Sequence, residues 1–219
     1  MLKTALEVRH LHTWDSHTPV IQNLSFDAKQ GELLALVSTC DSTRSSLINS
    51  LLGLVTHRQG SIRIHQTETI HFKPEQLAVL GVALCSTQLQ LYPELSCEEN
   101  LLMPLTTSHL GGGLSLIEIY ELFPLLAQQS HQSCASLSPE LQYFLAVARV
   151  LRSGADIIIF DQVPRRISFA LWPHIKYVLE QLKLRGYTLV LHASNKRFAT
   201  RIADKVYYLP SLSYTSSKP

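Results

Sequence analysis

The stretch ALVSTCDSTRSSLI, residues 35–48, decides the fold because it lies between two apolar runs of different kinds. LLALV, 33–37, is continuously apolar and predicts a buried strand, whereas SLINSLLGLV, 46–55, has leucine and isoleucine at helical spacing and predicts a helix. A loop that leads from a strand into a helix is a place where many proteins bind phosphate. This loop has neither glycine nor lysine, so alone it is an ordinary polar turn.

The composition limits the classes of protein to consider. The 219 residues suffice for one globular domain, with or without a subdomain. Charged residues make up only 16% and hydrophobic residues 46%, which favours a chain with partner surfaces. No apolar run approaches the roughly 20 residues of a membrane helix, and the first ten residues, MLKTALEVRH, lack the apolar core of an export signal. A net charge of +2 without a basic run indicates no nucleic-acid partner. We therefore expect a cytoplasmic protein.

Cysteine and histidine give no sign of a metal site or of disulfides. The cysteines at 40, 85, 97 and 134 show no CxxC spacing and are interpreted as core or loop thiols. His10 and His12 could share a strand face, but no third ligand follows at a suitable spacing. The sequence therefore predicts no metal site.

Strand and helix patterns alternate along the rest of the chain, which predicts an α/β sheet. Ser96 and Glu99 form a predicted capping box at the start of one helix, and DIIIFD, 156–161, is typical of a parallel strand covered on both faces. The predicted strands are 5–9, 20–27, 60–65, 79–85, 156–161 and 187–193; the predicted helices are 96–105, 115–126, 138–154 and 167–184; one more helix and strand follow within 197–209.

The order of these segments resembles the ATP-binding subunit of an ABC (ATP-binding cassette) transporter over residues 5 to about 209. Eight landmarks in the family's order carry the resemblance: LEVRHLH, VIQNLSFDAKQGELLALV, LLGLVTHRQGSIRI, LYPELSCEENL, SLSPELQYFLAVARVL, IIIFD, GYTLVLHASN and RIADKVYYL. The resemblance implies a P-loop NTPase-like mixed sheet flanked by helices, with an antiparallel β subdomain and a small helical subdomain. The implied division is a RecA-like core with the β subdomain over 1–85 and 146–210, a helical subdomain over 86–145 and a disordered tail over 211–219.

In this family two subunits pair head to tail and hold ATP between the phosphate loop of one and the signature motif of the other. The phosphate loop GxxxxGK[ST] uses glycines to turn backbone N–H groups toward phosphate and lysine to neutralise it. The matching positions here are Ser38, Asp41, Thr43, Arg44 and Ser45, so only the hydroxyl for Mg²⁺ is kept. A carboxylate at 41 would repel a polyphosphate, and the planar guanidinium of Arg44 is not equivalent to an ammonium.

Other positions of the family's chemistry have also changed. The carboxylate that orients Mg²⁺ matches Asp161, but the next residue, the family's catalytic glutamate, is Gln162, whose amide cannot accept a proton. The signature LSGGQ reads LSPEL, which places Ser138, Pro139 and Glu140 in its centre. Proline has no N–H to offer to a γ-phosphate, so the resemblance implies a weakened signature.

Three further family positions can be matched. The glutamine that contacts metal and water matches Thr87, with Gln88 next to it, and the switch histidine matches Ser194, with His192 two residues earlier. Trp14 could be the aromatic residue that stacks on adenine. A degenerate ATP site would therefore comprise Trp14, Ser38, Asp41, Thr43, Arg44, Ser45, Thr87 and Asp161, with a degenerate signature at Ser138, Pro139 and Glu140.

Each of these residues also has a purely structural interpretation. Asp161 could be a strand-end or helix-cap residue, Arg44 a surface or partner-facing charge, and Trp14 a packing residue. Ser138 is suited to be the N-cap of its helix because Pro139 fits the first helical position.

Three hypotheses for function follow. The first is a structural or regulatory pseudo-ATPase that binds no tightly held ATP or Mg²⁺ and docks at the inner face of a membrane. Its partners would be a membrane-spanning transporter subunit and an active ATPase paralogue or a second copy of itself. The second is a weak or altered ATPase using Arg44, Ser45, Asp161 and Gln162, and the third is a stand-alone protein-binding module. For the first, the expected partner-binding residues are Ser86, Thr87, Gln88, Leu89, Gln90, Leu91 and Tyr92.

Overall fold

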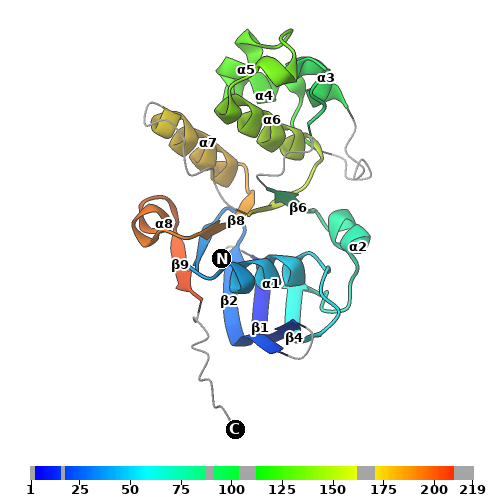
Figure 1. Cartoon of the computed structure of the whole chain (residues 1–219), viewed down its shortest axis with the longest axis vertical. Helices are drawn as coiled ribbons and strands as arrows, with labels where there is room; N and C mark the ends of the chain where they lie inside the picture. Colours follow the sequence, from blue (N-terminus) through cyan, green and yellow to red (C-terminus); the bar gives the residue numbers. More distant parts are fainter. Residues whose placement is uncertain (1–2, 16–17, 87–90, 104–111, 162–170, 210–219) are drawn as a thin grey trace.

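The computed structural model describes residues 3–15, 18–86, 91–103, 112–161 and 171–209. Two β-sheets form its centre, with helices between and beyond them (Figure 1). The predicted α/β architecture is confirmed.

The larger sheet is parallel and carries the candidate site at one end. Its strand order is β6-β7-β8-β3-β9. The strands are β3 (Leu33–Val37), β6 (Val82–Cys85), β7 (Ile157–Phe160), β8 (Thr188–Ala193) and β9 (Lys205–Tyr208). Every residue of β3, β7 and β8 is buried, as expected when helices or a second sheet cover both faces.

Successive residues of the central strands point into two different cores. Leu189 and Leu191 pack in one hydrophobic cluster, and Val190 between them packs in the other. This alternation follows from the two-residue period of a strand. The parallel sheet therefore connects a helical core on one side to a β core on the other.

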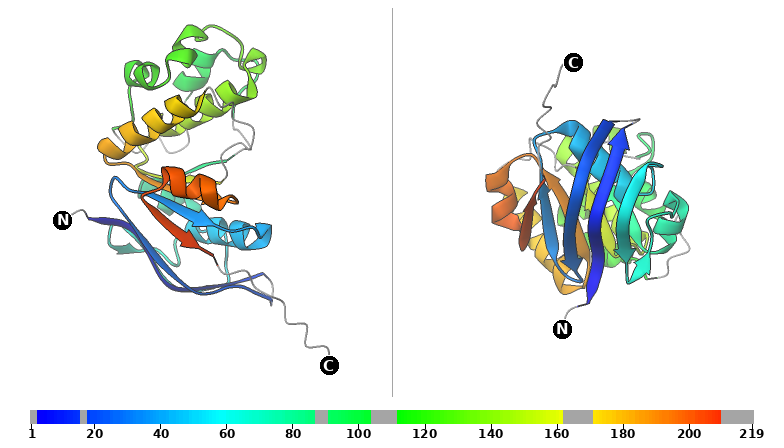
Figure 2. Two further views of the ribbon diagram at one scale, coloured as in Figure 1. Left: turned by 90° about the vertical axis from the view of Figure 1, so that its left-hand side faces the viewer. Right: turned by 90° about the horizontal axis from the view of Figure 1, so that it is seen from below.

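The second sheet is antiparallel, with the order β2-β1-β4-β5. Its strands are β1 (Thr4–Asp15), β2 (Thr18–Lys29), β4 (Arg58–Ile64) and β5 (Thr67–Glu68). Figure 2 shows from below how β1, β2 and β4 lie side by side beneath the rest of the chain. Helix α1 (Asp41–Leu51) packs in the same core as these strands through Leu47, Ile48 and Leu51.

A group of helices lies beyond the other face of the parallel sheet, at the top of Figure 1. They are α3 (Cys97–Leu102), α4 (Leu116–Leu122), α5 (Pro124–Gln128) and α6 (Pro139–Arg152), with a 3₁₀ turn at Cys134–Ser136. Helix α7 (Trp172–Leu184) contributes to the same core, while α2 (Pro74–Val79) and α8 (Lys196–Ile202) lie at the sides. The capping box of Ser96 and Glu99 is confirmed: Ser96 Oγ accepts from Glu99 N at 3.1 Å, and Glu99 accepts from Ser96 N at 2.7 Å.

The predicted bounds of one helix and one strand are wrong. The helix expected over 115–126 is broken at Phe123, because Pro124 disfavours helical geometry in the residue before it and begins a new helix. The strand expected over 79–85 starts only at Val82. Val79 ends α2, and Gly81, at φ +87°, makes the turn between them.

Within the described ranges, none of the helices has the length and apolar character needed to cross a bilayer.

Candidate functional site

The junction of β3 and α1 is shorter than the sequence predicted. Helix α1 begins at Asp41, not at 46, so only Ser38, Thr39 and Cys40 connect strand to helix. Residues 41–45 contain neither glycine nor proline, so nothing in them interrupts a helix. The negative charge of Asp41 in the first turn also stabilises the helix, because the N-terminal end of the helix dipole is positive. The polar residues therefore form the first turn of the helix.

Backbone groups in this connection are bonded within the protein. Ser38 N donates to Ala193 O at the end of β8, at 3.1 Å. Cys40 N donates to Ser38 Oγ at 3.0 Å, and Arg44 N donates to Cys40 O at 3.1 Å. The side chain of Ser38 therefore stabilises this turn.

Arg44 and Asp161 form the central contact of the site. Arg44 Nη1 lies 2.6 Å from Asp161 Oδ1, which joins the first turns of α1 to the end of β7. Arg44 Nε also lies 3.3 Å from Asp41 Oδ1. The guanidinium is thus held between two carboxylates, a pairing that the sequence did not predict.

The electrostatics of Arg44 follow from its partial burial. The side chain is 18% exposed and that of Asp161 is 24% exposed. Burial alone would lower the pKa of Arg44, but the hydrogen bond and the attraction of Asp161 outweigh it and raise the pKa. The guanidinium of Arg44 is therefore charged at physiological pH.

His192 is a buried neighbour of this pair. It lies on β8 in register with Leu36 of β3, and in the described part of the chain neither ring nitrogen has a hydrogen-bond partner. Burial, and then the positive charge of Arg44, lower the pKa of His192 to about 4. The imidazole is therefore neutral at pH 7. His192 is two residues before Ser194, the position that matches the family's switch histidine, but it is buried whereas Ser194 is exposed.

Cys40 precedes the helix and has an unusually acidic thiol. Its Sγ lies 3.0 Å from Ser42 Oγ. Hydrogen bonding to Ser42, and then to Thr43, lowers the pKa of Cys40 to about 7. Its interpretation as a loop thiol agrees with its place; only its position before a helix N-terminus could have indicated the acidity.

Thr43 and Ser45 complete the phosphate-loop positions and lie inside α1. Thr43 is buried, and Ser45 is half-buried. Next to Ser45, Ser46 Oγ bonds Thr13 Oγ1 of β1 at 2.6 Å. This bond brings the end of β1 against the start of α1.

Trp14 follows Thr13 on β1. Its ring stacks on His12 with the centroids 6.1 Å apart, and the backbone N–H of Trp14 donates to His57 O at 3.2 Å. Stacking on His12 is a packing role, so one face of the indole has a partner within the protein.

The signature-matching residues lie at the start of α6. Ser138 is the N-cap, with its Oγ accepting from Leu141 N at 3.3 Å, and Pro139 is the first helical residue. This structural interpretation of Ser138 is confirmed. Glu140 lies in the same first turn, where a negative side chain interacts favourably with the positive end of the helix dipole.

Several predicted positions cannot be placed. Thr87, Gln88, Leu89, Gln90 and Gln162 lie outside the described residues. Ser194 is described and is exposed, directly after β8. Among the described residues, no cluster of three histidine, cysteine or acidic side chains could hold a metal ion.

The partner-binding positions that are described include Ser86, Leu91 and Tyr92. Tyr92 is exposed, but the buried Asn100 fixes its backbone: Tyr92 N donates to Asn100 Oδ1 at 2.8 Å, and Asn100 Nδ2 donates to Tyr92 O at 2.9 Å. The guanidinium of Arg149 lies 5.3 Å from the centre of the Tyr92 ring. Tyr92 is therefore an exposed aromatic side chain in a fixed position.

The chain is similar in sequence to the ATP-binding proteins of known transport systems. It is 25% identical over 198 residues to the high-affinity branched-chain amino acid transport ATP-binding protein BraG of Pseudomonas aeruginosa, covering 90% of this chain and 85% of BraG. It is 23% identical to the ribose import ATP-binding protein RbsA of Bacillus subtilis, covering 92% of this chain but only 42% of RbsA.

Solved structures share the fold at lower identity. An ATP-binding cassette of an ABC transporter in its ADP conformation superposes with a TM-score of 0.80 at 17% identity, covering 94% of this chain and 87% of that one. The cbiO1 protein of Clostridium perfringens gives 0.78 at 15% identity, covering 94% and 85%. These likenesses confirm the ABC-type fold.

The family model described as ABC transporter matches residues 21–163, which include the connection at 38–40, Arg44, the start of α6 and Asp161. By this match, the chain belongs to the ABC transporter ATP-binding cassette family.

Proposed function

We propose that this chain is a catalytically inactive ABC subunit that supports a membrane transport complex without hydrolysing ATP. The observation that carries the proposal is the ion pair between Arg44 and Asp161. Asp161 stands where the family's Mg²⁺-orienting carboxylate belongs, and one of its oxygens already accepts from Arg44 at 2.6 Å.

The residues do not fit Mg²⁺-bound ATP. Moving Arg44 toward a phosphate would leave a partly buried carboxylate without its partner, which costs free energy. The loop amides of Ser38 and Cys40 already donate to Ala193 O and Ser38 Oγ, and the carboxylate of Asp41 would repel phosphate. With an amide at Gln162, general-base assistance worth roughly 10²- to 10⁴-fold would also be missing.

A nucleotide-binding measurement tests this proposal against the weak-ATPase alternative. Isothermal titration with millimolar Mg-ATP is expected to give no binding heat and no shift in melting temperature. A micromolar Kd that is lost in the Arg44→Ala variant would instead establish the alternative, with Arg44 as the phosphate ligand.

The transport role rests on the family and on a fixed exposed surface. The name of BraG assigns it to amino acid transport, and cbiO1 is described as part of the ABC transporter complex cbiONQ. Exposed apolar side chains occur on this chain near β6 and α3, at Leu84, Tyr92, Leu102 and Met103. We place the docking surface for a membrane-spanning subunit here, together with 86–92.

The proposal also includes the division of the chain and its location. The core would comprise 1–85 and 146–210, the helical subdomain 86–145, and the location would be the cytoplasmic face of the membrane. The second subunit of the assembly would be an active ATPase paralogue or another copy of this chain.

Co-purification from detergent extracts of the source cells tests the docking surface. A tagged chain is expected to retain a membrane-spanning transporter subunit, and the Tyr92→Ala variant to retain much less. Tyr177→Ala is the matched control, because that tyrosine is about as exposed, 49% against 45%, but lies on α7. Recovery of the chain alone would favour the stand-alone binding module.

A further inference from the structure

A wide groove separates the first turns of α7 from α8. These two helices lie on the left of Figure 1. Its volume is about 780 Å³, within the usual range of binding pockets. Trp172 and Lys176 of α7 line one wall, and Arg197, Phe198, Arg201 and Ile202 of α8 line the other. None of these residues belongs to the site built around Arg44.

Three positively charged side chains line the groove. Lys176, Arg197 and Arg201 are exposed and form no ion pair with another described residue. Among the described residues that line the groove, none is acidic. Two nearby lysines are paired, by contrast: Lys183 Nζ of α7 lies 2.7 Å from Asp204 Oδ1, and Lys205 Nζ of β9 lies 2.8 Å from Asp27 Oδ2. Three cations facing one groove repel one another, so an anionic occupant would relieve that repulsion.

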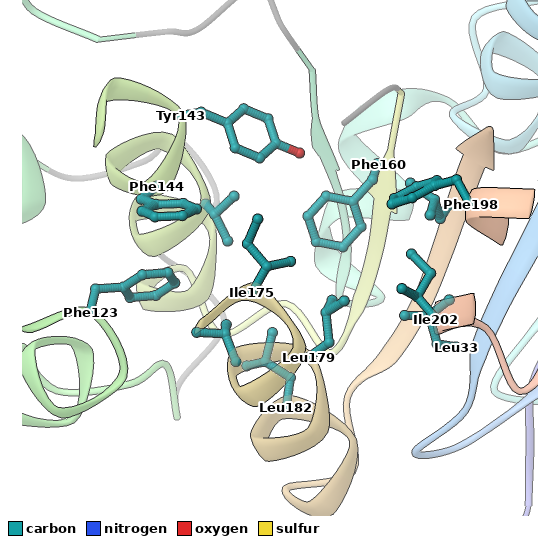
Figure 3. A pocket seen from close by; sticks show the side chains of 13 residues that line it. Leu33, Phe123, Tyr143, Phe144, Phe160, Ile175, Leu179, Leu182, Phe198 and Ile202 are labelled. Atoms are coloured by element: carbon teal, nitrogen blue, oxygen red, sulfur yellow. The ribbon is translucent and has the colours of Figure 1, made fainter. Parts of the chain in front are cut away.

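The floor of the groove is apolar and continues inward. The rings of Trp172 and Phe198 meet edge to face across the groove, with centroids 5.1 Å apart. Phe198 and Ile202 also line a cavity of about 50 Å³ beneath, which they share with Ile175 and Leu179 of α7 (Figure 3). An occupant with an apolar side chain could therefore bury it between Phe198 and Ile202.

We infer that this groove binds an acidic polypeptide segment of a partner protein, with carboxylates facing Lys176, Arg197 and Arg201 and one bulky apolar side chain on Phe198 and Ile202. A single-stranded nucleic acid fits less well. Its bases need exposed aromatic faces, whereas Trp172 is half-buried against Phe198 and the floor is partly aliphatic. The inference does not depend on whether the chain hydrolyses ATP.

Tryptophan fluorescence provides a direct test, because Trp14 and Trp172 are the chain's two tryptophans. In a Trp14→Phe background, the remaining indole reports on the groove alone. Short peptides in which glutamates and aspartates flank a leucine or phenylalanine are titrated into the full chain. We expect a saturable change in Trp172 fluorescence that weakens as salt rises from about 50 mM to about 500 mM, and no change with peptides whose apolar residue is serine.

Charge reversals give the matched comparison. Arg201→Glu and Lys176→Glu, on opposite walls, are each expected to weaken binding about tenfold or more. Lys196→Glu changes the charge equally on α8 but outside the groove, where Lys196 lies over the ring of Tyr208, and it should leave the affinity unchanged. Circular dichroism melts show whether each variant folds.

Three results would overturn the inference. One is the absence of any fluorescence change with the whole peptide series. Another is equal weakening by Lys196→Glu. The third is that the peptides do not bind, whereas single-stranded DNA or phosphatidylglycerol vesicles bind through Lys176, Arg197 and Arg201.

Discussion

Arg44 and Asp161 show how much of a site depends on contacts that no local pattern contains. They are 117 positions apart in the chain, and each is unremarkable in its own segment. The sequence identified both positions through the family's motifs, but it left Arg44 as either a surface or partner-facing charge or a phosphate ligand. Only the fold, in which α1 and β7 contribute to the same hydrophobic core, brings the guanidinium to the carboxylate.

Breaking this pair should destabilise the protein. Arg44→Ala leaves Asp161 partly buried without its partner, so we expect the free energy of unfolding in urea to fall by about 1–3 kcal/mol. The control is Arg63→Ala, because its pair with Glu68 is exposed on both sides, at 54% and 43%, and should contribute far less. Equal losses in the two variants would contradict the structural role of the Arg44 pair.

His192 should make stability depend on pH. The unfolded chain protonates this histidine below its ordinary pKa of 6.5, whereas the folded chain does so only below about 4. The unfolded state therefore binds more protons between these values, so stability is complete above about pH 6.5 and falls toward pH 4, by at most about 3 kcal/mol.

Urea titrations across this pH range test the effect. The His192→Leu variant should have a flatter profile than the parent, whereas His131→Leu, at an exposed position, should keep the parent profile. A parental slope in His192→Leu would show that another group carries the dependence.

At the scale of elements, the strands and most helices could be predicted, and the errors have identifiable causes. The polar run after β3 was predicted as a loop because its residues are not apolar, yet it starts α1, since neither proline nor glycine interrupts it. Conversely, the apolar periodicity of 115–126 predicted one helix and overlooked the effect of Pro124 on Phe123. Hydrophobic periodicity locates buried faces but does not fix where a helix begins or ends.

The start of α6 provides a test of a residue's structural role. Ser138→Ala removes the side-chain acceptor for Leu141 N, so we expect a loss of about 1 kcal/mol in unfolding free energy. Ser138→Asp keeps an acceptor at the N-cap and should restore most of it. If aspartate and alanine are equally destabilising in thermal melts, the cap is not the reason for serine at this position.

At the scale of the whole molecule, the sequence predicted the fold well because many segments agree with one arrangement. LLALV and IIIF are apolar throughout, and in the structure they lie within a sheet with a core on each face. The groove between α7 and α8 was not predicted. Lys176 is separated in sequence from Arg197 and Arg201, and nothing local indicates that their side chains share one surface.

The central claim is that this chain has the fold of an ABC ATPase but does not hydrolyse ATP. Measuring the phosphate released from Mg-ATP tests this claim most directly. The purified protein, alone and with its co-purified membrane subunit, is compared with the Asp161→Asn variant. We predict that release by the parent does not exceed release by the variant. Mg²⁺-dependent turnover by the parent that disappears in Asp161→Asn would contradict the claim and establish Asp161 as a working metal-site carboxylate.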